Sequence, residues 1–387
     1  MNDREYGLVL SGGGTKGAYQ VGMLKALRKI GIKIKAITGV SIGALNAAMF
    51  LQKDPDAAEK IYTNIKMKDI MNTPGVDEEK NIFDVSNLIA LISNMSKQKG
   101  LDNQAFRETI EKNLNIDEVY ESEIDFGLLA YSVNNKVPVE KFKDEIPRNQ
   151  MVDYLLASAS FPIFKPQKVG EDEYLDGGVY DNSPINMLIK KGYKNIILSD
   201  INGLGQNQKL ISKDIYLKVI HPSEDLGGTF EFNKEKMLRN IKMGYLDTLR
   251  HFGVLQGHVY YFQKEEFEKL MDIFNLQTIY GLEYAAEMYK IDKYKEYTAE
   301  EFLAELDRKH RIAKIKYDAF KKDNILQLGK AFKNLFDGGL GICIAKDLYM
   351  DKPASKLSNY MLNFLKDYQV AAKAILELEN CFKTVER

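Results

Sequence analysis

The chain has 387 residues, of which 45% are hydrophobic and 28% charged, a balance typical of a globular protein and not of a disordered one. The formal net charge of −1 excludes the overall positive field on which nucleic-acid binding depends, so we expect no nucleic-acid partner. The N-terminus passes from charged residues directly into an apolar run without a signal-peptide pattern, and no stretch is suited to spanning a bilayer. We therefore expect a soluble, cytoplasmic protein.

The first half of the chain alternates strand and helix patterns. A short apolar run at residues 6–10 predicts a buried strand, and residues 17–31 place apolar side chains at helical spacing with Gly31 at the end. Residues 32–38 and the small-residue segment after Ser41 repeat this strand–helix unit. Such alternation predicts an α/β fold with a largely parallel central sheet flanked by helices.

Further patterns extend this α/β region to about residue 220. Residues 125–133 and 136–142 are separated by asparagines and predict a β-hairpin. The remaining expected elements are, in chain order, a helix at 151–160, a strand at 173–176, a helix at 184–192 and strands at 195–200 and 215–220.

The character of the chain changes after about Thr229. Proline almost disappears, and long amphipathic patterns rich in Lys, Glu, Tyr and Leu take over. We place a boundary within residues 223–230. The expected organisation is an α/β domain over residues 1–228 and a mostly helical C-terminal region over residues 229–387.

Two features of the C-terminal region concern the redox state of its cysteines and its contact with a membrane. Cys343 and Cys381 lie in apolar or helical settings and are expected to be reduced. The basic amphipathic stretch 309–336 is a candidate for peripheral contact with an anionic membrane surface. The alternative is one or two packed helices with a solvated lysine face.

A glycine-rich loop, SGGGTKG at residues 11–17, joins the first expected strand to the first expected helix. Gly12, Gly14 and Gly17 match the dinucleotide fingerprint G-x-G-x-x-G, which makes an oxidoreductase a rival hypothesis. That fingerprint also requires an acidic residue about twenty positions later, and the second expected strand ends without one. A P-loop is disfavoured as well, because Gly17 is not followed by Lys and Ser or Thr.

A second glycine motif, GVSIG, places Ser41 between Gly39 and Gly43 at an expected strand-to-helix turn. A nucleophilic hydroxyl that stands clear of the backbone requires such a turn, since bulky side chains at the glycine positions would clash. The backbone N–H groups of the first loop would then receive the oxyanion that forms when serine attacks an ester. Both loops follow neighbouring parallel strands, so we expect them at one edge of the sheet; an ordinary βα turn is the alternative.

A serine nucleophile needs a base, and the chain offers two candidates. His221, together with Asp176 or Asp200, would give the order Ser–Asp–His of an α/β-hydrolase triad. Asp176 alone is the other candidate, because Gly177 and Gly178 permit a tight turn that brings its carboxylate close to another backbone segment. A simple turn without catalytic function is the alternative interpretation of the DGG sequence.

SGGGTKG, GVSIG and DGG, in this order, resemble the three signatures of the patatin-like phospholipases, a family of lipid acyl hydrolases with a Ser–Asp dyad. The segments ASASFPIFKP and NSPINML are also similar to that family's connecting sequence, and the resemblance covers roughly residues 6–220. It implies a three-layer α/β/α fold, with Ser41 as nucleophile and Asp176 as proton acceptor. The implied oxyanion hole is Gly12, Gly13 and Gly14, with Gly13 and Gly14 as the expected donors.

The resemblance also implies supporting positions and a substrate class. Lys16 matches the basic position of the first motif, and the supporting glycines are Gly17, Gly39, Gly43, Gly177 and Gly178. No cofactor and no metal are implied, and the substrate is a phospholipid or another fatty-acyl ester. A catalytically silent lipid-binding protein of the same fold is the alternative. The candidates for the acyl pocket, each of which would otherwise belong to the core, are Met23, Leu45, Met49, Phe161 and Phe164.

Overall fold

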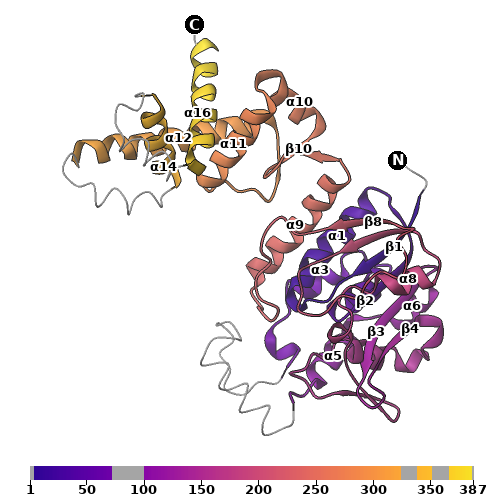
Figure 1. The fold of residues 1–387 in the computed structure, drawn as a ribbon. Coiled ribbons are helices and arrows are strands. Elements are labelled where there is room, and N and C mark those ends of the chain that lie inside the picture. Colours follow the sequence, from indigo (N-terminus) through magenta and orange to yellow (C-terminus); the bar gives the residue numbers. More distant parts are fainter. Residues whose placement is uncertain (1–3, 72–99, 324–337, 351–365, 386–387) are drawn as a thin grey trace. The chain divides into compact units, whose positions relative to one another are not determined.

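The computed structural model describes residues 4–71, 100–323, 338–350 and 366–385 (Figure 1). The chain divides into two compact units, Met1–Leu249 and Arg250–Arg387. Each unit has buried side chains of its own, and the glycine motifs all lie in the first unit.

The described residues of the first unit form an eight-stranded sheet with the order β5-β6-β3-β2-β1-β7-β8, and β4 pairs with β3. The neighbouring strands β3, β2, β1, β7 and β8 are parallel to one another. In contrast, β4 and β6 are antiparallel to β3, and β5 is antiparallel to β6. This confirms the expected largely parallel sheet. The strands are β1 Glu5–Leu10, β2 Lys33–Val40, β3 Asp125–Ser132, β4 Val137–Phe142, β5 Gln167–Val169, β6 Asp172–Asp176, β7 Asn195–Ser199 and β8 Tyr216–Ile220.

Helices cover both faces of this sheet. Ala36 and Val40 of β2 pack in clusters with side chains of α8 (Ile185–Lys190). Because side chains alternate along a strand, Gly39 faces the other side, where a Cβ atom would lie 2.6 Å from the backbone nitrogen of Ala44 in α2 (Ile42–Phe50). The first unit therefore has the expected three layers. Its other helices are α1 Ala18–Lys29, α3 Ala57–Tyr62, α5 Gln104–Asn113, α6 Ile116–Glu121, α7 Met151–Ser158 and α9 Lys234–His251, with short 3₁₀ turns at η1 Gly14–Gly17, η2 Met67–Asp69, η3 Lys143–Glu145, η4 Arg148–Gln150 and η5 Gly177–Val179.

Helix α9 belongs to the first unit because its backbone lies directly against α1. A Cβ atom at Gly22 would come within 1.8 Å of the Ile241 carbonyl oxygen, and one at Gly244 within 2.0 Å of the Tyr19 carbonyl oxygen. Only glycine at these two positions allows the helices to approach so closely. The first unit therefore continues through Leu249, whereas the sequence placed the boundary before α9, at 228/229.

The second unit is mostly helical in its described residues, and it also contains a small three-stranded sheet that the sequence patterns did not indicate. Its core includes a group of aromatic rings, in which Tyr260, Phe262 and Tyr297 each contact Phe302 with ring centroids 5.2 to 5.8 Å apart. The elements are α10 Lys264–Ile273, α11 Leu276–Met288, α12 Ala299–Asp323, α14 Gly338–Met350, α16 Lys366–Val385, β9 Leu255–Gln256, β10 Tyr261–Gln263 and β11 Glu296–Tyr297.

Two expectations for the C-terminal region can be compared with these elements. Cys343 and Cys381 are free thiols. Of the basic stretch 309–336, residues 309–323 form the end of α12, and the remainder lies outside the described residues. Within the described ranges, no helix has both the length and the apolarity needed to cross a bilayer.

Candidate active site

Strands β2 and β6 lie along the same edge of β3, and their C-terminal ends face each other. β2 runs parallel to β3 with Val40 opposite Leu129, and β6 runs antiparallel to it with Asp176 opposite Ala130. Since β4 occupies the other edge of β3 over the same residues, β2 and β6 must share an edge. The residue that follows β2, Ser41, is thereby brought next to the last residue of β6, Asp176.

Ser41 occupies a sharp turn between β2 and α2, with φ 57° and ψ −130°. This left-handed conformation is strained for a residue with a side chain, and it turns the hydroxyl outward as in a nucleophile elbow. The Ser41 N–H lies 3.2 Å from the Ser158 carbonyl oxygen and 3.1 Å from its Oγ, which helps to hold the turn. A Cβ atom at Gly39 would lie 2.5 Å from the Gly43 carbonyl, and one at Gly43 would lie 2.1 Å from the Leu10 oxygen. Both glycines are therefore required by close backbone packing.

Asp176 is a buried carboxyl group, with 3% of its surface exposed. It accepts a hydrogen bond from the Ser41 hydroxyl and another, 2.8 Å long, from the Gly178 N–H. Burial raises the pKa of Asp176 from its ordinary 3.8 to about 6, because the charged form is poorly solvated, while the hydrogen bonds from Ser41 and Gly178 act in the opposite direction. At neutral pH the group is an ionised carboxylate with more affinity for a proton than an exposed aspartate.

The glycine-rich loop lies against Ser41. A Cβ atom at Gly12 would be 3.2 Å from the Ser41 Cβ, and the loop continues through η1 into α1. The Gly12 N–H donates to the Asn182 carbonyl oxygen at 3.3 Å. Among the described residues, the N–H groups of Gly13 and Gly14 donate to no protein acceptor, and both glycines line the same pocket as Ser41. These two groups are therefore available to a developing negative charge.

Asn182 is a part of the site that the sequence analysis missed. Its side-chain Nδ2 donates to the Gly12 carbonyl oxygen at 3.3 Å, so it ties the glycine loop to the turn after Asp176. The residue is 5% exposed and lines the pocket. The only signal in the sequence is an asparagine shortly after DGG and two residues before Pro184, and such a pattern has many structural explanations.

The other positions of the motifs have structural contacts. The Lys16 ammonium group donates to the Asn202 carbonyl oxygen at 2.9 Å and does not line the pocket. A Cβ atom at Gly17 would lie 2.4 Å from the Tyr62 hydroxyl, and one at Gly177 would lie 2.4 Å from the Leu129 oxygen. These glycines allow close packing of the elements that present Ser41 and Asp176.

His221 lies away from Ser41. It follows β8, which is three strands from β2 in the sheet, or about 14 Å at the usual strand spacing. Its Nδ1 is 3.8 Å from the Asp200 carboxylate, and its side chain is 54% exposed. The structure thus brings Asp176 to Ser41 and pairs His221 with Asp200 elsewhere.

An apolar pocket opens beside Ser41 and Asp176, with an empty volume of about 1150 Å³ that includes some open solvent. Four of the expected lining residues are on its wall: Leu45, Met49, Phe161 and Phe164. Met23 is not one of them: it is fully buried in the core, and its backbone nitrogen lies near Gly244 of α9. Phe230 and Phe232, which follow the expected domain boundary, also line the pocket and were missed by the sequence analysis.

Within the described part of the chain, no cluster of three His, Cys, Asp or Glu side chains is suited to a metal ion.

Comparison with known proteins identifies relatives of the part of the chain that forms this site. Residues 8–189 match the family described as patatin-like phospholipase. The probable lipid hydrolase 463L of Invertebrate iridescent virus 6 is 30% identical over 190 residues, which are 47% of this chain and 63% of the viral protein. Patatin-like phospholipase domain-containing protein 7 of Rattus norvegicus is 25% identical over 197 residues, which are 50% of this chain and 13% of the rat protein.

Among solved structures, VipD from Legionella pneumophila is similar with a TM-score of 0.42 and 14% sequence identity, over 96% of this chain and 90% of VipD. The chain covers less than two thirds of the length of the viral and rat relatives.

Proposed function

Because residues 8–189 match the family described as patatin-like phospholipase, we propose that this protein is a lipid acyl hydrolase with Ser41 as its nucleophile and Asp176 as its base. The observation that supports this most directly is the buried Asp176 carboxylate, which accepts the Ser41 hydroxyl hydrogen beside an apolar pocket. A pKa raised to about 6 by burial suits a group that must both take up and release a proton near neutral pH.

In the first half of the reaction, the Ser41 oxygen forms a bond to the ester carbonyl carbon while its proton moves to the Asp176 carboxylate. The electron pair of the carbonyl double bond moves onto the oxygen, which the Gly13 and Gly14 N–H groups stabilise. Collapse of this intermediate breaks the bond to the leaving alcohol, which takes the proton from Asp176. The acyl group remains on Ser41.

In the second half, water replaces the alcohol. Asp176 accepts a proton from the attacking water, and the same two N–H groups stabilise the second oxyanion. The bond between the Ser41 oxygen and the acyl carbon then breaks, and Ser41 takes back the proton from Asp176. The products are a fatty acid and the regenerated serine.

The pocket supports a fatty-acyl ester as substrate. Its lining is dominated by aliphatic and aromatic side chains, and among the described lining residues there is no Lys or Arg to pair with a phosphate. Binding energy would then come from the acyl chain through apolar burial, with little discrimination between headgroups inside the pocket. Phospholipids, lysophospholipids and neutral esters of equal chain length should all be tested as substrates.

The roles of the residues can be tested with three variants. We expect Ser41→Ala and Asp176→Asn to lower kcat by at least about a thousandfold, because each removes a group that reacts in both steps. We expect His221→Ala to change kcat by less than about threefold, because the ring is too distant to take the Ser41 proton. Ester hydrolysis is measured on the substrate panel, and a fluorophosphonate probe reports covalent modification at Ser41.

The outcomes separate the competing hypotheses. Loss of activity in folded His221→Ala would favour a Ser–Asp–His triad over the Ser41–Asp176 pair. A folded wild-type protein that neither hydrolyses any ester nor reacts with the probe would favour a lipid-binding protein without catalysis.

A further inference from the structure

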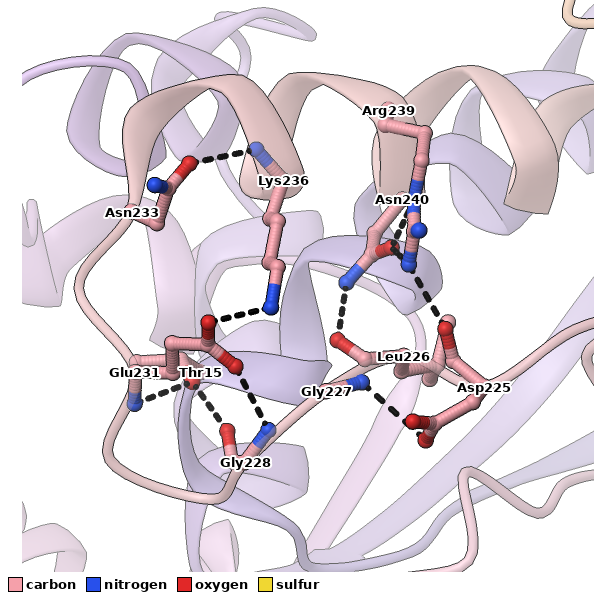
Figure 2. Close-up of polar contacts among 10 residues, drawn as sticks. All are labelled: Thr15, Asp225, Leu226, Gly227, Gly228, Glu231, Asn233, Lys236, Arg239 and Asn240. Atoms are coloured by element: carbon pink, nitrogen blue, oxygen red, sulfur yellow. Dashed lines mark hydrogen bonds and ion pairs between the residues drawn. The ribbon is translucent and has the colours of Figure 1, made fainter. Parts of the chain in front are cut away.

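The glycine loop of the candidate active site is held by a segment from a distant part of the chain. Residues 225–233, which we call the strap, are the later part of the connection between β8 and α9 and run alongside Thr15 (Figure 2). The Thr15 N–H donates to the Thr229 carbonyl oxygen at 2.8 Å. The Thr15 hydroxyl donates to the Gly228 carbonyl oxygen at 2.9 Å and accepts from the Glu231 N–H at 3.2 Å. Thr15 thus uses both its backbone and its side chain to bind the strap.

The strap also contacts Gly14, one of the two proposed oxyanion donors. Gly14 has φ +59°, and a Cβ atom there would lie 2.1 Å from the Thr229 carbonyl oxygen. The strap backbone therefore passes directly over the Gly14 α-carbon. Because Gly14 and Thr15 are adjacent, the position of the strap and the direction of the Gly14 N–H are coupled.

The first part of the strap is anchored on α9. The Asn240 side chain, 2% exposed, donates to the Leu226 carbonyl oxygen at 2.9 Å. Arg239 donates to the Asp225 carbonyl oxygen at 2.6 Å, as Figure 2 shows. These bonds tie two strap carbonyls to side chains of a helix that itself lies against α1. The anchor and the loop that it holds therefore belong to one packed body.

The second part of the strap is braced by an ion pair. The Glu231 carboxylate accepts a 2.9 Å hydrogen bond from the Gly228 N–H and pairs with the Lys236 ammonium group of α9. This arrangement closes a turn around Gly228, the residue whose carbonyl accepts the Thr15 hydroxyl. Asn233 accepts from the Lys236 N–H at 2.9 Å, where α9 begins.

The same strap forms part of the pocket wall. Thr229, Phe230 and Phe232 line the pocket, and the Phe230 ring contacts Phe161 edge to face with centroids 5.5 Å apart. The segment that holds the glycine loop is thus also in position to contact the acyl chain. Neither Thr229 nor the two phenylalanines lies within the residues that match the family.

We propose that the strap holds the glycine loop in the conformation that receives the oxyanion, and that Thr15 is the positioning residue through which it does so. This inference rests on the proposed function, since it assigns a role to the strap in that reaction. Donors fixed in place before the reaction stabilise a developing charge without a cost of reorganisation, and a displacement of about 1 Å can cost about a hundredfold in rate. Thr15 also lines the pocket, and the role assigned to it here is to position Gly14 through its bonds to the strap.

The experiment compares three threonine variants of the full chain. Thr15→Val removes the hydroxyl at nearly constant volume, and Thr15→Ser keeps it. Thr63→Val is a matched control, because the Thr63 hydroxyl bonds to near neighbours in the chain at the end of α3: it donates to the Lys60 carbonyl oxygen and accepts from the Asn64 Nδ2. Lys236→Met is a fourth variant that weakens the strap without changing the glycine loop.

We expect Thr15→Val to lower kcat about 10- to 100-fold with less than a threefold change in KM, because oxyanion stabilisation acts in the transition state. Thr15→Ser and Thr63→Val should stay within about threefold of wild type, and Lys236→Met should lower kcat in the same direction by a smaller factor. An alkylboronic acid, which forms a tetrahedral adduct with serine, should bind Thr15→Val more weakly by about the factor lost in kcat. A fatty alcohol, which forms no adduct, should bind equally to wild type and Thr15→Val.

Amide hydrogen exchange of the peptide covering residues 11–17 gives a readout that is independent of activity. We expect faster exchange in Thr15→Val than in wild type and no change in Thr15→Ser. If Thr15→Val fails to fold, Lys236→Met tests the same claim through the strap.

Two results would overturn the inference while the proposed function stands. In the first, the wild type is active and folded Thr15→Val has the same kcat. In the second, Thr15→Val differs from wild type in KM alone. A wild-type protein inactive toward every ester and toward the fluorophosphonate probe would overturn the proposed function itself.

Discussion

Ser41 and Asp176 depend on different physical features of their surroundings. Ser41 is held in a strained left-handed turn by two close-packed glycines and by bonds from its N–H to Ser158. Asp176 depends on burial, which raises its pKa to about 6, partly offset by the hydrogen bonds from Ser41 and Gly178. A carboxylate alone is a weak base for a serine hydroxyl, so this environment is a necessary part of the proposed mechanism.

The raised pKa predicts a pH dependence. Asp176 must be ionised to accept the Ser41 proton, so kcat/KM should fall about tenfold per pH unit below about 6 and level off above it. Initial rates with a soluble short-chain ester between pH 4.5 and 8.5 would measure this. The His221→Ala variant should show the same profile, because His221 takes no part in the proposed reaction. A midpoint that moves in His221→Ala would contradict the assignment to Asp176.

At the scale of elements, the site depends on the crossing of α1 and α9. Gly22 and Gly244 let the two helix backbones approach, and α9 in turn anchors the strap that holds Thr15. The Tyr19 hydroxyl reinforces the crossing by donating to the buried Asp247 carboxylate at 3.1 Å. A helix that follows the expected domain boundary is therefore part of the structure that supports the glycine loop.

This crossing can be tested by adding one methyl group. We expect Gly244→Ala to destabilise the first unit by roughly 1–3 kcal/mol, because its Cβ would lie 2.0 Å from the Tyr19 carbonyl oxygen and α9 would have to move. Lys242→Ala, at an exposed position of the same helix, is the control and should change the stability by less than about 0.5 kcal/mol. Urea unfolding of both variants gives the comparison; equal stabilities would show that the close approach is not required.

At the scale of the whole molecule, the second unit has a core of its own and a buried polar network that joins four helical segments. His310 of α12 bonds to the Tyr289 hydroxyl at 2.6 Å and to the Glu379 carboxylate of α16 at 2.9 Å. Glu379 also pairs with Lys346 of α14 at 2.6 Å. The hydrogen bond from His310 and the pairing with Lys346 lower the pKa of Glu379 to about 2. Burial acts in the opposite direction and raises this pKa, but its effect is smaller than theirs.

We expect Glu379→Gln to destabilise the second unit by about 2 kcal/mol at pH 7, because it leaves Lys346 buried without its anionic partner. The folded-state pKa of Glu379 lies below its ordinary value of 4.5, so its contribution is present above that value and is lost as the pH falls toward 2. The difference from wild type should therefore shrink in acid.

Glu377→Gln, at an exposed position of the same helix, is the control; its side chain accepts a 2.8 Å hydrogen bond from the Thr278 hydroxyl, which the glutamine amide oxygen can also accept, so the effect should be below about 0.5 kcal/mol. Hydrogen exchange in α11 and α16 of the full chain measures both variants. An equal effect of the two substitutions would show that the network is not specifically stabilising.

The local patterns of the sequence determined the elements and the reactive groups. Strand and helix periodicity predicted the sheet, and the hairpin of β3 and β4 was correctly identified from two apolar runs separated by asparagines. The glycines around Ser41 predicted a tight turn, and the structure has one. Such features depend on residues close together in the chain, where steric and hydrogen-bonding preferences act directly.

The tertiary structure decided which of these groups meet. It brought Asp176 and not His221 to Ser41, placed Met23 in the core, and used Asn182 and the strap to hold the glycine loop. Thr15 and Thr229 are 214 positions apart, and nothing in either local sequence indicates that they bond. Their contact follows from the packing of α9 on α1, which depends on many weak interactions across the whole unit and therefore cannot be inferred from one stretch of residues.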